Sequence, residues 1–135
     1  MAKKLYTTTM TNKGGRAGEV WSNDRKWDFK IGTPGVDKDS TNPEQLFAAG
    51  FASCFNGALD IALQQAGVSG EPTVRAKVSL FQEGDGPDFH IGVELVGHIE
   101  GLDEAETKKY MAIAETICPY SKATRGNIEV NISAE

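Results

Sequence analysis

The sequence from residue 42 to residue 67 reads NPEQLFAAGFASCFNGALDIALQQAG, and it carries the clearest helix signal in the chain. Asn42 suits the N-cap, Pro43 suits the first helical position, and Gly67 suits the position just after the helix. Apolar residues recur at three- and four-residue spacing and also spread nearly all round the helix, at Phe47, Phe51, Cys54, Ala58 and Ile61. Glu44 and Gln45 suit the first turn, so the pattern predicts a buried central helix that opens at Pro43 and continues over residues 46–65 until Gly67, with Cys54 on its apolar face.

Segments rich in β-branched and aromatic residues flank this helix and predict strands. Short strands are expected over residues 5–12, 20–21 and 27–31, an antiparallel pair over 74–82 and 89–99, and a last strand over 127–132. A second helix should open at Asp103 and end near Cys118, because a residue that precedes proline disfavours helical geometry. No repeat or linker interrupts the pattern, so the sequence predicts one α+β domain over residues 1–135.

Charge and composition exclude several classes of partner. The chain has 14 Lys and Arg against 19 Asp and Glu, a net charge of −5, which repels nucleic acid. Polar residues such as Asn56 and Asp60 interrupt the apolar stretches, so no membrane span of about 20 residues is expected. No apolar signal region follows Met1, which predicts a cytoplasmic location. Stable structural disulfides are rare in that compartment, so Cys54 and Cys118 form a candidate redox pair.

Reduction of a peroxide by a thiol needs a thiolate, a nearby cation and a second thiol that discharges the sulfenic acid. Cys54, Cys118 and an arginine, Arg16, could fill these roles. From the pattern alone, Cys54 is equally compatible with a small buried hydrophobic residue, whereas Cys118 is more typical of one and Arg16 is more typical of a solvated loop charge. Glu44 is more typical of a first-turn residue that the helix dipole favours.

Two longer motifs change this balance. Residues 41–55 read TNPEQLFAAGFASCF and residues 118–130 read CPYSKATRGNIEV. Together with the Leu5-Tyr6-Thr7 start and the Gly14-Gly15-Arg16 loop, they closely resemble the organic hydroperoxide resistance (Ohr) family of the OsmC-like superfamily. The resemblance covers essentially the whole chain. It implies an OsmC-like α+β fold, with antiparallel sheets packed around two main helices in an intertwined homodimer.

The resemblance also implies an activity, a thiol peroxidase that reduces alkyl or fatty-acid hydroperoxides. Cys54 would be the peroxidatic cysteine, Cys118 the resolving cysteine, Arg16 the catalytic arginine and Glu44 its partner. No bound cofactor or metal is implied, and the disulfide would be reduced by an external dithiol such as dihydrolipoamide or a lipoylated protein. Aromatic residues near the motifs are candidates for an apolar substrate pocket: Phe47, Phe51, Phe55 and Tyr120. Ala17 departs from the acidic residue expected after the arginine.

A helix that is continuous from Glu44 to Cys54 separates the two residues by about 15 Å along its axis. Either the helix breaks near residues 49–50, or an Arg16–Glu44 pair from a neighbouring subunit serves Cys54. We favour the second version, a homodimer with active sites at the subunit boundary.

Other classes of function remain open at this point. The cysteine pair could belong to a redox sensor that does not turn over, to an OsmC-branch peroxidase with another substrate preference, or to a structural protein with inert thiols. A metal module is disfavoured, because His90 and His98 lie about 26 Å apart on an extended strand and the cysteines lack a zinc-ligand spacing.

Overall fold

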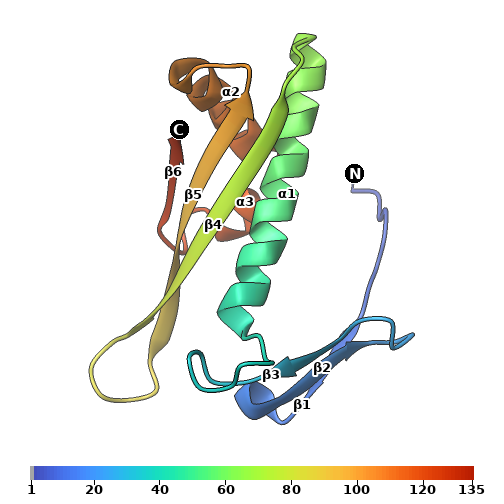
Figure 1. The fold of residues 1–135 in the computed structure, drawn as a ribbon, viewed down its shortest axis with the longest axis vertical. Helices are drawn as coiled ribbons and strands as arrows, with labels where there is room; N and C mark the ends of the chain where they lie inside the picture. Colours follow the sequence, from blue (N-terminus) through green and yellow to red (C-terminus); the bar gives the residue numbers. More distant parts are fainter. Residues whose placement is uncertain (1) are drawn as a thin grey trace. The chain divides into compact units, whose positions relative to one another are not determined.

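The computed structural model describes residues 2–135, which divide into two compact units, one up to Leu46 and the other Phe47–Glu135. The first unit contains a three-stranded antiparallel sheet in the order β1-β2-β3, whose strands are β1 (Met10–Lys13), β2 (Gly18–Ser22) and β3 (Asp28–Ile31) (Figure 1). A short 3-10 helix, η1 (Gly15–Ala17), connects β1 to β2.

The first strand is shorter than the sequence predicts. Met10 pairs with Ser22, which is the last residue of β2. β2 therefore offers no partner to the residues before Met10, and Leu5 and Tyr6 are 84% and 79% exposed. The expected strand over residues 5–12 is wrong in its first half for this reason.

The long helix α1 (Pro43–Ala66) begins and ends as the sequence predicts. The backbone N–H of Gln45 donates to Asn42 Oδ1 at 2.8 Å, which makes Asn42 the N-cap. Gly67 follows the helix with a φ of 67°, a left-handed conformation that favours glycine. The helix is continuous through residues 49–50, so the predicted alternative of a break there is wrong.

One expectation about α1 is corrected by the structure, and one observation qualifies another. Ile61 is 43% exposed rather than buried, because it shares a helix face with the exposed residues Gly57, Gln64 and Gln65. In addition, α1 is long and apolar enough, by length and composition alone, to cross a membrane, although the sequence predicted no such segment. The polar residues are too sparse to prevent this. The central helix of a globular core passes the same test, and 33% of the apolar window in α1 is buried.

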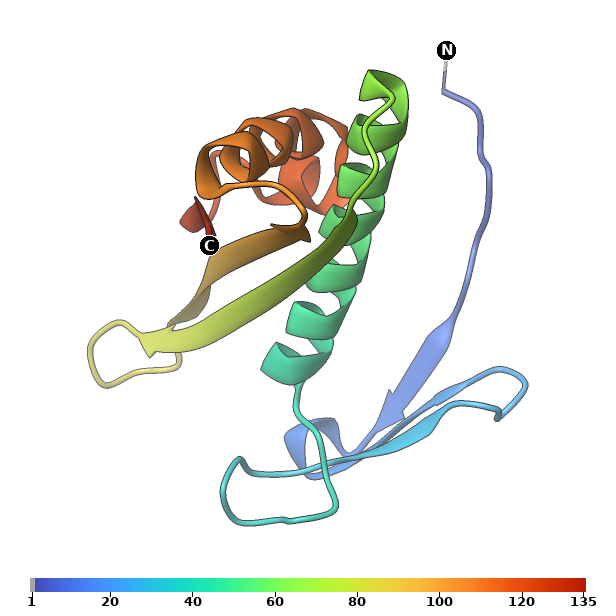
Figure 2. The same ribbon diagram turned by 45° about the horizontal axis from the view of Figure 1, so that its top comes forward.

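The second unit holds the hydrophobic core. Strands β4 (Glu71–Gln82) and β5 (Phe89–Glu100) form the predicted antiparallel pair, and β6 (Val130–Ala134) joins β5 in parallel, so this sheet is mixed. Figure 2 shows α1, α2 (Glu104–Ile117) and α3 (Pro119–Thr124) against this sheet. Their contact buries six large side chains completely: Phe51, Phe55, Leu59, Leu95, Ile99 and Met111.

The sequence analysis did not predict the short helix α3. The expected end of the second helix near Cys118 is correct, since α2 stops at Ile117. Pro119 then occupies the first position of a new short helix, where the missing N–H of proline is harmless. Cys118 is consequently both the C-cap of α2 and the N-cap of α3.

Candidate functional site

The second unit brings the two cysteines together. Cys54 lies in the middle of α1, and Cys118 lies in the extended corner between α2 and α3, with φ −63° and ψ 120°. Their Sγ atoms are 3.5 Å apart and both thiols are free. A disulfide has an S–S length of about 2.05 Å, so bond formation needs only a small local approach. Cys118 is fully buried whereas Cys54 is partly exposed, so only Cys54 is accessible to an external oxidant in this unit.

The surroundings of Cys54 act on its pKa in opposite directions. Burial among apolar groups raises the pKa of the Cys54 thiol, and the nearby Cys118 thiol raises it further. The backbone N–H of Tyr120 lowers this pKa by hydrogen bonding to the sulfur. No lysine or arginine of residues 47–135 contributes to the shift. Within residues 47–135, burial and the Cys118 thiol thus oppose ionisation of Cys54, and the Tyr120 N–H favours it.

The first unit pairs the two charged residues that the sequence singled out. Arg16 Nη1 donates to Glu44 Oε2 at 3.0 Å, and Nη2 donates to Oε1, so the pair is bidentate. The guanidinium side chain is 57% exposed and the carboxylate 14%. The hydrogen bonds to Arg16 lower the pKa of the Glu44 carboxyl, and those to Glu44 raise the pKa of Arg16. Glu44 fixes the direction of a guanidinium whose remaining N–H groups are free to bind an anion.

The loop that carries Arg16 is held by Asn12, a residue that the sequence analysis did not single out. Asn12 Oδ1 accepts from the Gly15 backbone N–H at 3.0 Å, and Asn12 Nδ2 donates to the carbonyls of Gly15 and Glu19, each at 3.1 Å. Gly14 has a φ of 88°, which its lack of Cβ permits. The sequence signal that could have identified this role is an asparagine placed just before the Gly14-Gly15 pair. Asn12 contacts do not involve the side chain of Ala17, so the departure at Ala17 leaves them in place.

Three aromatic side chains form a cluster next to the cysteines. The ring centroids of Phe47 and Phe51 are 5.9 Å apart, those of Phe47 and Tyr120 are 6.1 Å apart, and those of Phe51 and Tyr120 are 5.7 Å apart. Phe51 and Phe55 are fully buried and belong to the hydrophobic core, whereas Phe47 is half-buried and Tyr120 is 38% exposed. Of the four candidate pocket residues, Phe47 and Tyr120 are therefore the ones that a substrate can reach in this unit.

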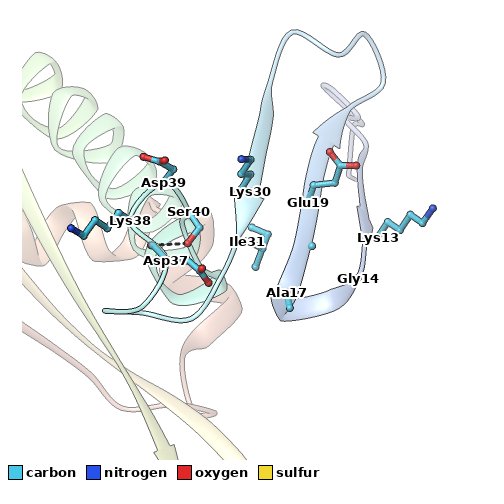
Figure 3. A pocket seen from close by; sticks show the side chains of 11 residues that line it. Lys13, Gly14, Ala17, Glu19, Lys30, Ile31, Asp37, Lys38, Asp39 and Ser40 are labelled. Atoms are coloured by element: carbon cyan, nitrogen blue, oxygen red, sulfur yellow. Dashed lines mark hydrogen bonds between the residues drawn. The ribbon is translucent and has the colours of Figure 1, made fainter.

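A hollow of about 750 Å³ lies in the first unit, on the sheet β1-β2-β3 and the loop that follows it (Figure 3). Its lining includes three lysines and three carboxylates, namely Lys13, Lys30, Lys38, Glu19, Asp37 and Asp39. Within the loop, Ser40 Oγ donates to the Asp37 carbonyl at 3.1 Å. The charged lining is unlike the apolar pocket that the sequence analysis expected.

The histidines have local partners. The His90 ring stacks on Phe81 with centroids 5.0 Å apart and lies 3.6 Å from Glu83. His98 Nδ1 is 2.9 Å from the Glu135 backbone oxygen. Across residues 2–135, no group of three or more His, Cys, Asp or Glu side chains is arranged to hold a metal ion.

Comparison with known proteins defines the class. Residues 35–133 match the family model for OsmC-like protein, and the chain belongs to this family. It is 41% identical over 131 residues to the organic hydroperoxide resistance protein OhrB of Bacillus subtilis, covering 95% of this chain and 96% of that protein. It is 44% identical to an organic hydroperoxide resistance protein-like sequence of Staphylococcus aureus, covering 95% and 94%. Within the OsmC-like class, the chain thus belongs to the organic hydroperoxide resistance family, as its motifs predicted.

Solved structures of relatives have the same fold. The crystal structure of Bacillus subtilis OhrB matches with a TM-score of 0.91 and 39% identity, covering 98% of this chain and all of that chain (100%). The organic hydroperoxide resistance protein of Elizabethkingia anophelis matches with a TM-score of 0.89 and 40% identity, covering 99% of each chain. The expected OsmC-like α+β fold is therefore confirmed.

Proposed function

We propose that this protein is a cysteine-based peroxidase that detoxifies organic hydroperoxides. The observation that carries the proposal is the 3.5 Å contact between a partly exposed cysteine, Cys54, and a fully buried one, Cys118. The curated relatives are named for resistance to organic hydroperoxides, which supports the same class of substrate. A relative from Vibrio cholerae, 34% identical over 98% of this chain, is described with captopril bound in one of its active sites.

The proposed cycle begins when the Cys54 thiolate attacks the distal oxygen of the hydroperoxide. The O–O bond breaks, an alcohol leaves after protonation, and Cys54 becomes a sulfenic acid. The Cys118 thiol then attacks the sulfenic sulfur, so that an S–S bond forms and water leaves. The contact between the two sulfurs supports this second step without a large rearrangement.

Arg16 is assigned the role of the cation that stabilises the Cys54 thiolate and the charge on the departing oxygen. Two observations support this assignment. The second unit supplies no cation to the sulfur, and the bidentate contact with Glu44 orients the guanidinium. Because α1 is continuous between Glu44 and Cys54, we propose that the pair serves the thiol at a subunit boundary in a homodimer.

Exposed apolar side chains in both units support the proposal that a second copy of this chain binds there. In the first unit, Leu5, Trp27 and Val36 are 84%, 63% and 72% exposed, and in the second unit Leu80 and Phe89 are 46% and 55% exposed. Exposed apolar side chains of this size are usual at interfaces between subunits. We propose that dimer formation covers them.

The disulfide has to be reduced before another turnover. We propose an external dithiol, dihydrolipoamide or a lipoylated protein, as the reductant, in a reducing cytoplasmic compartment. Phe47 and Tyr120, with Phe51 and Phe55 behind them, would favour alkyl or fatty-acid hydroperoxides over hydrogen peroxide.

Turnover tests this function. Reduced protein with dihydrolipoamide should consume many equivalents of cumene hydroperoxide, and consume hydrogen peroxide more slowly. Consumption of a single equivalent, even with excess dithiol, would instead indicate a redox sensor. A preference for hydrogen peroxide would indicate a different branch of the OsmC-like family.

A further inference from the structure

Gly50 lies against the side chain of Tyr120. A Cβ atom at residue 50 would lie 2.8 Å from the Tyr120 hydroxyl and 3.2 Å from two of its ring carbons. Cβ atoms essentially never come closer than 3.0 Å to another group, and two ring carbons lie nearly as close as the hydroxyl, so any other residue at this position requires the Tyr120 side chain to shift. Glycine in the middle of a helix is unfavourable relative to alanine. The close approach of Tyr120 supplies a physical reason for glycine at this position.

The Tyr120 ring links the segment that carries Cys118 to α1. Tyr120 follows Cys118 by two residues, and its ring packs on Phe47 and Phe51 of α1 with centroids 6.1 Å and 5.7 Å away. Phe51 precedes Cys54 by three residues, which is about one helical turn. Figure 1 accordingly shows α3 beside α1. The distance between the two sulfurs therefore depends on how closely this ring packs on the helix.

We propose that Gly50 and Tyr120 are positioning residues for closure of the Cys54–Cys118 disulfide, with Gly50 leaving the space in which the Tyr120 ring holds Cys118 Sγ 3.5 Å from Cys54 Sγ. The place of this closure in a peroxide cycle rests on the proposed function. In that step the Cys118 sulfur displaces the sulfenic oxygen of Cys54, and the oxygen leaves as water with the thiol and sulfenic protons. Neither Gly50 nor Tyr120 exchanges an atom or an electron.

A displaced ring has a defined chemical consequence. If Cys118 moves away from Cys54, the sulfenic acid lives longer and meets a second peroxide molecule more often. The second oxidation gives a sulfinic acid, which thiols do not reduce. A bulkier residue at position 50 therefore slows the resolving step and favours overoxidation, while the first attack on peroxide by Cys54 continues.

The test compares Gly50→Ala with Gly57→Ala. Gly57 lies on the same helix, is exposed, and has no atom within 4 Å of its hypothetical Cβ, so it receives the same substitution without the contact. Reduced protein is mixed with one equivalent of cumene hydroperoxide, and sulfenic acid and disulfide are followed separately by dimedone trapping and mass spectrometry. Closure is also measured with diamide, which oxidises the thiol pair without peroxide chemistry.

With Gly50→Ala, we expect disulfide closure to slow by about tenfold or more with both oxidants, since a misplacement of about 1 Å can cost about a hundredfold in an intramolecular step. The first attack on peroxide is followed separately, because the displaced Tyr120 ring is also one that a substrate can reach, and the diamide measurement isolates closure from it. Gly57→Ala should leave both steps unchanged. Adding Tyr120→Phe removes the hydroxyl that makes the 2.8 Å contact, and the double variant should recover part of the closure rate.

Closure at the unaltered rate in Gly50→Ala would overturn the proposal. So would equal slowing in Gly50→Ala and Gly57→Ala. If the unaltered protein does not react with cumene hydroperoxide but Gly50→Ala still slows disulfide closure by diamide, the proposed peroxidase function fails while the positioning role of Gly50 stands. Circular dichroism of each variant verifies that α1 is retained.

Discussion

Cys118 Sγ lies 3.5 Å from Cys54 Sγ, although 64 positions separate the two residues in the sequence. Cys54 reaches this place from the middle of α1, and Cys118 from the corner where α2 ends and α3 begins. The accessible sulfur is on the helix and the shielded one is in the corner. The unequal exposure implies unequal roles for the two thiols.

Single replacements of the cysteines separate those roles. Cys54→Ser should reduce no cumene hydroperoxide, because the buried Cys118 thiol is inaccessible. Cys118→Ser should reduce about one equivalent and then stop with a sulfenic acid at Cys54. Dimedone labelling and mass spectrometry measure both results. The reverse pattern, with one equivalent reduced by Cys54→Ser, would assign the attacking role to Cys118.

Replacement of Arg16 tests whether this arginine lowers the pKa of the Cys54 thiol. Burial raises the pKa of Cys54, so Arg16→Ala should lower its reactivity near neutral pH, by about tenfold for each pKa unit that Arg16 supplies. Arg16→Lys should restore this only partly, because an ammonium lacks the planar fork. The rate of iodoacetamide alkylation of Cys54 against pH measures the thiol pKa.

Arg75 offers a matched control for this experiment. It makes a bidentate contact with a carboxylate too, at 2.7 Å and 3.2 Å to Glu135, and its side chain is also 57% exposed. Arg75→Ala should leave the alkylation profile unchanged. An equal change of the Cys54 pKa in the Arg16 and Arg75 variants would mean that the net charge of the protein, and not a specific neighbouring cation, sets this pKa.

The Arg16–Glu44 pair should also make stability depend on acidity. The pair lowers the pKa of Glu44 in the folded protein below its ordinary value of 4.5. Its contribution is therefore fully present above pH 4.5 and is lost as the pH falls through the lower folded value. Urea unfolding between about pH 3 and pH 7 measures it. Glu44→Gln should unfold with a smaller pH dependence in this window, and an identical dependence in both proteins would contradict the account.

The exposed apolar residues at the end of the β4–β5 hairpin lead to a prediction about assembly. Sedimentation of the unaltered protein should show a dimer, and Leu80→Glu combined with Phe89→Glu should weaken it by placing charges in the interface. If active sites lie at the subunit boundary, peroxidase activity should fall in parallel with the dimer fraction while the Cys54 thiol remains titratable. Full activity in a verified monomer would refute the shared site.

The sequence was informative where local signals and the fold agree. Asn42, Pro43 and Gly67 mark α1 because capping and left-handed backbone geometry depend on neighbouring residues alone. The pairing of Cys54 with Cys118 in a disulfide was predicted from a family resemblance, because no local sequence feature of either cysteine specifies a partner so far along the chain.

The features that the sequence missed depend on packing. Asn12 and Gly50 act through close contacts with the Arg16 loop and with Tyr120, and such contacts leave no periodic signal. The helix α3 has only six residues, which is too few to show a hydrophobic periodicity. In addition, the Cys118-Pro119 pair was interpreted as the end of one helix, and the start of a second helix at the same proline was not recognised. The exposure of Ile61 depends on which face of α1 the core covers.

The central claim concerns one bond between two sulfurs, and mapping that bond tests it most directly. Reduced protein receives one equivalent of cumene hydroperoxide, is alkylated without reductant, and is digested for mass spectrometry. The account predicts one equivalent of alcohol and a single disulfide that joins the Cys54 and Cys118 peptides within one chain. Unmodified thiols with the peroxide intact, or disulfides found only between chains, would contradict it.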